Sequence, residues 1–281
     1  MAAATSAALG RRLVTGVILA ICAVLAVRAG GVAFLTVVSA FTAIVTFEWI
    51  RMSCREGSHG TLLVALITVS ASAAAMAIWG AEWALIAAAI GAVAVGSVAK
   101  LENNKALLVA AGVAVFIVSL ISTIWLRAEN TTGMVTIYWL FAVVWATDSG
   151  AYIVGSMAGG ARLAPRISPA KTWAGALGGL AVGILSGIAV AFLLSAIGVL
   201  EAMPNMAAVI AASALLSIFA QAGDLAESGV KRFFGVKDSG SWLPGHGGAL
   251  DRLDSLIFVT PIVALAVLLA GGSRHLIWAG G

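Results

Sequence analysis

Long apolar runs dominate the pattern of hydrophobic and polar positions along the chain. A helix needs about 20 apolar residues to cross a hydrocarbon core about 30 Å thick, and most of the runs have roughly that length. They cover residues 13–27, 31–50, 61–80, 82–99, 106–126, 133–152, 173–198, 205–225 and 251–271. Only the short turn at residues 80–82 divides the third run from the fourth. The pattern predicts an all-α, polytopic transmembrane protein with about nine spans.

The first run follows Arg11 and Arg12 and therefore resembles the apolar part of a signal peptide. No convincing short cleavage region follows it, and eight further runs do, so we interpret it as the first span. Composition supports a membrane protein, because the chain is 62% hydrophobic and only 10% charged. A soluble domain carries about 25% charged residues.

The basic residues indicate the orientation of the spans. With the N-terminus in the cytoplasm and nine spans, 13 of the 16 Lys and Arg residues fall on the cytoplasmic side. Only Arg28, Arg127 and Arg274 fall outside, as the positive-inside rule expects. We therefore predict an N-inside, C-outside topology. Most of the net charge of +4 then reflects topology rather than nucleic-acid binding.

The polar residues divide the single membrane domain, residues 1–281, into two unlike parts. Before residue 140 the acidic residues are all Glu, and each lies at a span end or in a loop, where solvation costs little. We interpret residues 1–140 as scaffold spans. The five Asp residues all come later, at predicted cytoplasmic ends of spans or in cytoplasmic loops. Ionisable groups at membrane depth are usually functional, so residues 141–271 are the expected catalytic part.

Carboxylates come in closely spaced pairs in this second part. Asp251 and Asp254 are three residues apart at the start of the ninth span, so they share a helix face. Asp224 and Glu227 form a similar pair at the end of the eighth. Neighbouring carboxylates repel each other unless a cation lies between them. Mg²⁺ prefers carboxylate, water and phosphate oxygens.

Glycines and basic residues accompany these pairs. His246, Gly247 and Gly248 lie just before the last helix, where exposed N–H groups suit a phosphate. The nearby positive charges are Lys171, Lys231, Arg232, Lys237 and Arg252. Each residue alone fits a solvated cytoplasmic loop. Together, acidic groups for a metal and basic groups for phosphate indicate phosphoryl or nucleotidyl transfer.

Residues 228–254 closely resemble the signature of the phosphatidate cytidylyltransferase family, also called CDP-diacylglycerol synthases. The shared pattern is Ser-x-apolar-Lys-Arg, four residues, Lys-Asp, then Pro-x-His-Gly-Gly and Asp-Arg-x-Asp. Segments around Asp148, Lys171 and Asp224 are similar to the family as well, so the specific resemblance covers about residues 148–256. Ala249 departs from it, since larger aliphatic residues are usual there, which should affect packing more than chemistry.

The resemblance implies that CTP and phosphatidic acid react to give CDP-diacylglycerol and pyrophosphate. It also implies Mg²⁺, with K⁺ sharing the metal site. Asp224, Asp251 and Asp254 would be the metal carboxylates, and Lys171, Lys231 and Arg252 would hold phosphates. His246 joins these six as a candidate catalytic residue. The wider substrate-binding set adds Ser168, Arg232, Lys237, Gly247 and Gly248.

Other functions stay open at this stage. Carboxylates within spans also fit a transporter or channel, although these carboxylates gather at one face and the two halves show no repeat. A different nucleotide–lipid enzyme, such as a polyprenol kinase, and a non-catalytic relative are further alternatives. We expect a prokaryotic cytoplasmic (inner) membrane, an active site facing the cytoplasm, and contact with membrane lipids. The resemblance adds a homodimer as an expectation.

Overall fold

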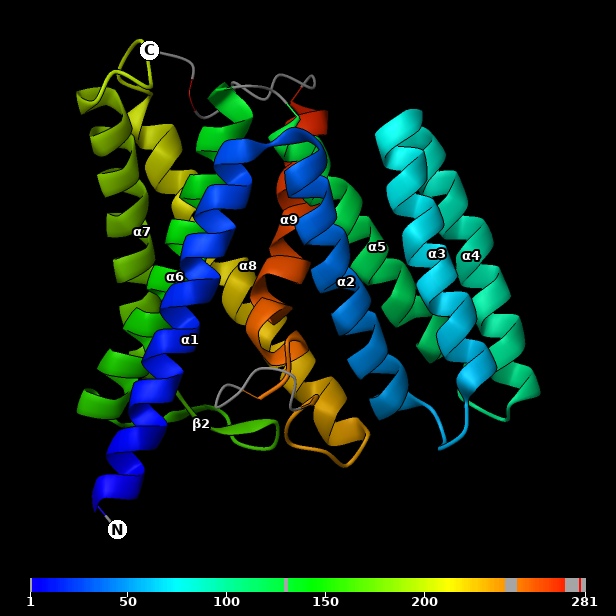
Figure 1. Ribbon diagram of the computed structural model, residues 1–281. Helices are drawn as coiled ribbons and strands as arrows, with labels where there is room; N and C mark the ends of the chain where they lie inside the picture. The colour runs from blue at the N-terminus through cyan, green and yellow to red at the C-terminus, as the bar shows by residue number, and fades with distance from the viewer. Residues whose placement is uncertain (1, 129–130, 241–246, 271–277, 279–281) are drawn as a thin grey trace. The chain divides into compact units, whose positions relative to one another are not determined.

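The structure is a computed structural model that describes residues 2–128, 131–240, 247–270 and 278, with side chains from residue 16 onward. It consists almost entirely of helices (Figure 1). The helices are α1 (Ala2–Ala29), α2 (Gly31–Ser53), α3 (His59–Ile78), α4 (Ala81–Leu101), α5 (Ala106–Arg127), α6 (Thr131–Ala158), α7 (Trp173–Ala196), α8 (Met206–Phe233) and α9 (Leu250–Leu269).

The predicted all-α, polytopic membrane architecture is confirmed. Each predicted span overlaps one helix, and the helices α2 to α9 are all long and apolar enough to cross a membrane. In α1, the apolar segment among the residues with described side chains is shorter, Gly16–Ala29. The N-inside, C-outside orientation stays a prediction.

The chain divides into two compact units. Unit 1 comprises Met1–Trp125 and Phe233–Leu253, and unit 2 comprises Leu126–Arg232 and Asp254–Gly281. The last residue of α8 and the first residues of α9 therefore belong with α1 to α4 and most of α5. The assignment of residues 1–140 to a scaffold and 141–271 to catalysis stays a prediction.

In unit 1, a carboxylate from one helix end caps the start of another helix. The antiparallel neighbours α3 and α4 lie side by side (Figure 1). Glu102 follows the end of α4 and accepts hydrogen bonds from the backbone N–H groups of Gly60 (3.0 Å) and Thr61 (3.2 Å) and from the Thr61 hydroxyl (2.5 Å). N–H groups in the first turn of a helix have no acceptor within that helix. The Glu102 carboxylate supplies the missing acceptors, as an N-cap side chain does.

We expect this cap to make stability depend on pH. The Thr61 hydroxyl, helped by the Thr61 and Gly60 amides and by His59, lowers the pKa of Glu102 against the opposing effect of burial. A lowered pKa in the folded state means that the stabilisation is present above the ordinary value of about 4.3 and is lost as pH falls through the folded value. Glu102→Gln should therefore lower the melting temperature in detergent at pH 7. The gap between wild type and variant should close on acidification, and a gap independent of pH would contradict this assignment.

In unit 2, glycines let α7 approach its neighbours closely. Gly175, Gly179, Gly183 and Gly187 recur every fourth residue along α7, and all are buried. A Cβ on Gly179 would lie 2.8 Å from the Thr147 carbonyl oxygen of α6. Small residues at this spacing are typical of close helix contacts in membranes.

Hydroxyl groups join α6 and α8 beside this glycine face. The Thr147 hydroxyl of α6 lies 2.9 Å from the Ser217 hydroxyl of α8, and the Trp139 indole N–H donates to Ser213 at 3.0 Å. Each of these groups is buried. They lie in an apolar core that includes the fully buried Leu140, Val143 and Val259.

The loop between α6 and α7 contains a small hairpin that the pattern of apolar runs did not predict. Strand β1 (Arg162–Ala164) pairs antiparallel with β2 (Ser168–Thr172). The Arg162 guanidinium donates to the Ala170 carbonyl at 3.3 Å. Thr172 ends β2 and caps α7, because its hydroxyl accepts the Gly175 N–H at 3.0 Å. The hairpin therefore fixes residue 171 directly before a helix start.

Candidate active site

The predicted site residues are divided between the two units. Unit 2 contains Ser168, Lys171, Asp224, Lys231, Arg232 and Asp254. Unit 1 contains Lys237, Gly247, Gly248, Asp251 and Arg252. His246 lies outside the described residues. The two parts of the set are therefore described one at a time.

Lys171 and Asp224 form an ion pair in unit 2. Lys171 comes from β2 and Asp224 from α8, and the ammonium nitrogen lies 2.5 Å from a carboxylate oxygen. Both side chains are partly exposed. The predicted phosphate ligand thus lies directly beside a predicted metal ligand, an arrangement in which a phosphate could replace the carboxylate as the partner of Lys171.

A second ion pair follows one turn later on α8. Lys231 lies 2.7 Å from the carboxylate of Glu227, four residues before it. The preferred order for such a helical pair is Glu before Lys. The pair lies beyond the apolar run that ends at residue 225, so α8 continues well past its predicted span. The Arg232 guanidinium, next along the helix, donates to the Ile167 carbonyl at 3.4 Å in the hairpin loop.

Asp254 adds a further carboxylate to this part of unit 2. It is half-buried in α9, and the carboxylates of Asp224, Glu227 and Asp148 are close enough to interact with it electrostatically. Four carboxylates against the ammonium groups of Lys171 and Lys231 leave two negative charges when all are ionised (four minus two).

That excess charge and the all-oxygen donor set are what a hard divalent cation such as Mg²⁺ prefers. The residues therefore fit Mg²⁺ in charge and donor type. Within the described part of the chain, no group of three or more His, Cys, Asp or Glu is already arranged to hold a metal ion.

Asp251 makes different contacts in unit 1. Its carboxylate accepts the backbone N–H of Gly248 at 3.0 Å and that of Ser239 at 3.1 Å. It thereby ties the start of α9 to a residue twelve positions earlier. Although Asp251 and Asp254 are three residues apart on one helix, the first binds backbone amides and the second lies among carboxylates.

Glu48 is a component that the sequence analysis missed. We expected the acidic residues before position 140 to be solvated, and for Glu48 this is wrong, since only 1% of the residue is exposed. Its carboxylate accepts the backbone N–H groups of Ala249 (3.0 Å) and Leu250 (2.8 Å) and the hydroxyl of Ser239 (3.1 Å). Burying a carboxylate is costly without such donors, which explains why it is placed against a helix start.

Two glycines of the signature pack against this carboxylate. A Cβ on Gly248 would lie 1.9 Å from the Ser239 hydroxyl oxygen and 2.8 Å from a Glu48 oxygen. A Cβ on Gly240 would lie 2.5 Å from the other Glu48 oxygen. The two glycines therefore allow a protein carboxylate to approach the backbone closely.

This arrangement changes the expectation of free N–H groups at the start of α9. The amides of Gly248, Ala249 and Leu250 donate to Asp251 or Glu48. A phosphate that bound these amides would have to displace an existing hydrogen bond. Gly247, with a φ of 85°, occupies a backbone conformation that favours glycine. Lys237 and Arg252 are exposed, and Ser168 is half-buried at the start of β2.

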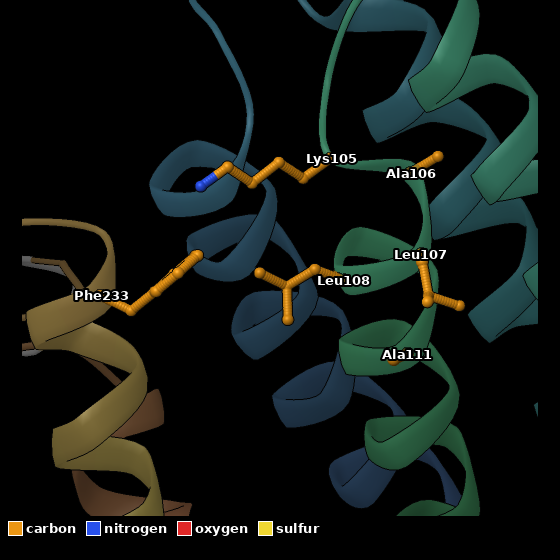
Figure 2. A pocket seen from close by; sticks show the side chains of 6 residues that line it. All are labelled: Lys105, Ala106, Leu107, Leu108, Ala111 and Phe233. Carbon is orange, nitrogen blue, oxygen red and sulfur yellow. The ribbon is translucent and has the colours of Figure 1, made fainter.

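Unit 1 also has an open groove of about 580 Å³ that contains none of the predicted site residues. Figure 2 shows its lining: Lys105, Ala106, Leu107, Leu108, Ala111 and Phe233. The Lys105 ammonium lies 4.0 Å from the centre of the Phe233 ring, a cation–π contact. The groove is otherwise apolar.

The sequence matches a family model along most of its length and individual known proteins along about half of it. The model of the cytidylyltransferase family matches residues 10–270. A phosphatidate cytidylyltransferase of Brucella suis biovar 1 (strain 1330) is 51% identical over 140 residues, which are 50% of this chain and 49% of that protein.

Staphylococcal relatives with the same name match a segment of similar length. The protein of Staphylococcus haemolyticus is 45% identical over 141 residues, or 50% of this chain and 52% of that protein. That of Staphylococcus aureus (strain COL) is 42% identical over 139 residues, or 50% of this chain and 51% of that protein. The matched segment thus spans about half the length of each curated relative. Because the family model covers nearly the whole chain, this protein belongs to the cytidylyltransferase family.

Proposed function

We propose that this protein transfers CMP from CTP to phosphatidic acid and releases pyrophosphate, giving CDP-diacylglycerol for phospholipid synthesis. The observation that carries the proposal is the group of Asp148, Asp224, Glu227 and Asp254 with Lys171 and Lys231 in unit 2. It combines oxygen donors for a cation with ammonium groups for phosphate. Family membership and the names of the relatives support the same reaction.

The reaction needs charge neutralisation more than base catalysis. The phosphate of phosphatidic acid is anionic near pH 7, so its oxygen can attack without losing a proton to the protein. That oxygen forms a bond to the α-phosphorus of CTP, the bond from the α-phosphorus to the β-bridging oxygen breaks, and pyrophosphate leaves with the electron pair. Lys171 and Lys231 would hold phosphate oxygens and offset the repulsion between the two anions.

A bound Mg²⁺ would supply further neutralisation of the phosphate charges. In unit 2, Asp224 and Asp254 are the residues that would hold it, with Asp148 and Glu227 nearby. Asp251 was predicted as a third ligand and stays a candidate, because a carboxylate that accepts two N–H groups still has lone pairs for a cation. We propose K⁺ as a second cation at the same site.

The site would face the cytoplasm from the inner membrane of a bacterium. The distribution of Lys and Arg supports this orientation, since cytoplasmic loops are enriched in both. CTP would then enter from water while the lipid reaches the site from the bilayer. Inverted membrane vesicles should turn over added CTP without permeabilisation, and a requirement for permeabilisation would refute the orientation. A homodimer remains a proposal, to be tested by the mass of the detergent-solubilised protein.

The direct test is pyrophosphate release by the purified protein in detergent with CTP, dioleoyl phosphatidic acid, Mg²⁺ and K⁺. We expect release that depends on both CTP and the lipid, with CDP-diacylglycerol formed in equal amount. Omitting each substrate in turn provides the controls. If folded protein released no pyrophosphate under these conditions, the proposal would fail, and a different lipid acceptor or a transport role would become the better explanation.

A further inference from the structure

A buried acidic residue of the expected scaffold contacts the signature segment. Glu48 lies near the end of α2, and its partners Ala249 and Leu250 are about 200 residues further along the chain, with sequence separations of 201 and 202. Nothing in the proposed reaction requires a carboxylate at this position. Burying it nevertheless carries a desolvation cost, which the hydrogen bonds that its carboxylate accepts must offset.

The contacts of Glu48 connect both ends of one segment. Its Oε1 accepts the Ala249 N–H, and its Oε2 accepts the Leu250 N–H and the Ser239 hydroxyl. It therefore links Ser239, which lies five positions before the Pro-Gly-His-Gly-Gly run, to the start of α9. His246 lies between these two ends in the sequence.

The same two ends hold Asp251. The Ser239 backbone N–H and the Gly248 N–H both donate to its carboxylate. Ser239 thus donates its hydroxyl to Glu48 and its amide to Asp251. The Asp251 carboxylate is oriented by residues that Glu48 fixes in place, so Glu48 acts on Asp251 through Ser239 and the start of α9.

We infer that Glu48 is a positioning residue, which clamps Ser239 to the start of α9 and thereby sets the orientation of Asp251 for the reaction. The inference rests on the proposed function for its catalytic consequence. It gives α2, which carries none of the predicted site residues, a defined part in building the site. The clamp itself is a structural arrangement that can be tested separately from turnover.

The sharpest variant is Glu48→Gln, which keeps the shape and removes the charge. A glutamine has one acceptor oxygen, and the best orientation places it at Oε2, where it keeps the Leu250 and Ser239 bonds. The NH₂ group then faces the Ala249 N–H, so two donors oppose each other. Loss of the Ala249 bond loosens the start of α9 and with it the orientation of Asp251, so we expect kcat/KM to fall about tenfold or more.

Glu102→Gln is the matched control. Glu102 also accepts two backbone N–H groups and a hydroxyl at a helix start in unit 1, but its partners are Gly60 and Thr61. Both variants therefore lose a carboxylate cap of the same kind. Only Glu48→Gln should raise the Mg²⁺ concentration needed for half-maximal rate. A loss of stability alone would not change the Mg²⁺ concentration at which the folded protein reaches half-maximal rate.

Hydrogen–deuterium exchange of the metal-free proteins gives a readout that does not depend on turnover. In Glu48→Gln, the peptide containing the Ala249 and Leu250 amides should exchange faster than in wild type, with no such change in Glu102→Gln. If Glu48→Gln fails to fold, Ser239→Ala removes one hydroxyl donor to the same carboxylate and should shift the Mg²⁺ dependence in the same direction by a smaller amount.

The outcomes separate the inference from the proposed function. Equal activity losses in both variants, or an unchanged Mg²⁺ dependence in Glu48→Gln, would overturn the inference while leaving the function intact. A wild-type protein that releases no pyrophosphate would refute the function. The exchange data alone would then test whether Glu48 holds Ser239 and the start of α9 together. Faster exchange in Glu48→Gln would support this role, and unchanged exchange would refute it.

Discussion

Asp254→Asn should abolish pyrophosphate release while leaving the protein at least as stable as wild type. Asparagine has nearly the same shape as aspartate but lacks the negative charge. Under the proposed function, the variant loses a charged ligand for the cation, and removing one such electrostatic contact costs about 10²–10³ in kcat. We expect a loss of at least that size in the pyrophosphate assay.

The predicted effect on stability has the opposite sign. In the metal-free protein, Asp254 lies within the electrostatic reach of Asp224, Glu227 and Asp148, and like charges destabilise the folded state. Removing one of them should keep or raise the melting temperature. The upward shift that Mg²⁺ produces in wild type should shrink in the variant, because a ligand stabilises only the state that binds it.

Two comparisons make this prediction specific. Glu201→Gln removes a carboxylate from the exposed loop after α7 in the same unit, and should change neither activity nor melting temperature. Asp251→Asn should lower both: its amide oxygen can replace Oδ2, which accepts the Ser239 and Gly248 N–H groups, but its NH₂ group would then replace Oδ1 and face the Ser239 N–H, and the charge that strengthens these bonds would be lost. Activity retained in Asp254→Asn, or a fall in its stability like that of Asp251→Asn, would contradict the assignment of Asp254 to a cation site.

The membrane spans could be predicted from the sequence because each apolar run is a local signal. The ends were less accurate where a helix continues past its apolar part. The eighth run ends at residue 225, whereas α8 continues to Phe233. Its last turns are polar, and the Glu227–Lys231 pair supports them. Hydropathy indicates which residues are apolar enough to lie in a membrane. It therefore does not detect the polar end of a helix that continues past its apolar run.

Residue spacing alone could predict only those parts of the candidate site that are close in sequence, and the family resemblance supplied more distant members such as Lys171 and Asp224. The pairs Asp224/Glu227 and Asp251/Asp254 were recognisable from their spacing. The role of Glu48 was not, because its partners are about 200 positions away, at separations of 191 to 202. A single Glu near the end of an apolar run looks like a solvated span end. The sequence also contained a signal for helix packing that we did not use, a glycine at every fourth position from residue 175 to residue 187.

That glycine face leads to the second large effect. Gly179→Leu should prevent α6 and α7 from packing, and the purified protein should lose most of its folded fraction. A Cβ at this position would lie 2.8 Å from the Thr147 carbonyl oxygen and 2.9 Å from the Ala151 Cβ. A backbone oxygen cannot rotate away as a flexible side chain can. Relief therefore requires the two helices to separate.

The substitution is informative because the helix propensity of leucine should stabilise α7, whereas its contact with α6 should destabilise the protein. Leucine favours a helix over glycine by nearly 1 kcal/mol, so a loss of stability cannot come from α7 alone. Overpacking a close contact costs about 1–3 kcal/mol even when neighbours can adjust, and more is expected against backbone. The measurement is the melting temperature and the monodisperse fraction on size exclusion in detergent.

Ala181→Leu is the matched control, since it adds a similar side chain two residues further along α7 at an exposed position. It should leave the folded fraction unchanged, whereas equal behaviour of the two variants would show that α6 and α7 do not make this contact. The contact also bears on the site, because α6 carries Asp148 and α7 begins two residues after Lys171. Gly179→Leu should therefore reduce activity even in the protein that remains folded, by moving the helix that fixes Lys171 relative to the helix that carries Asp148.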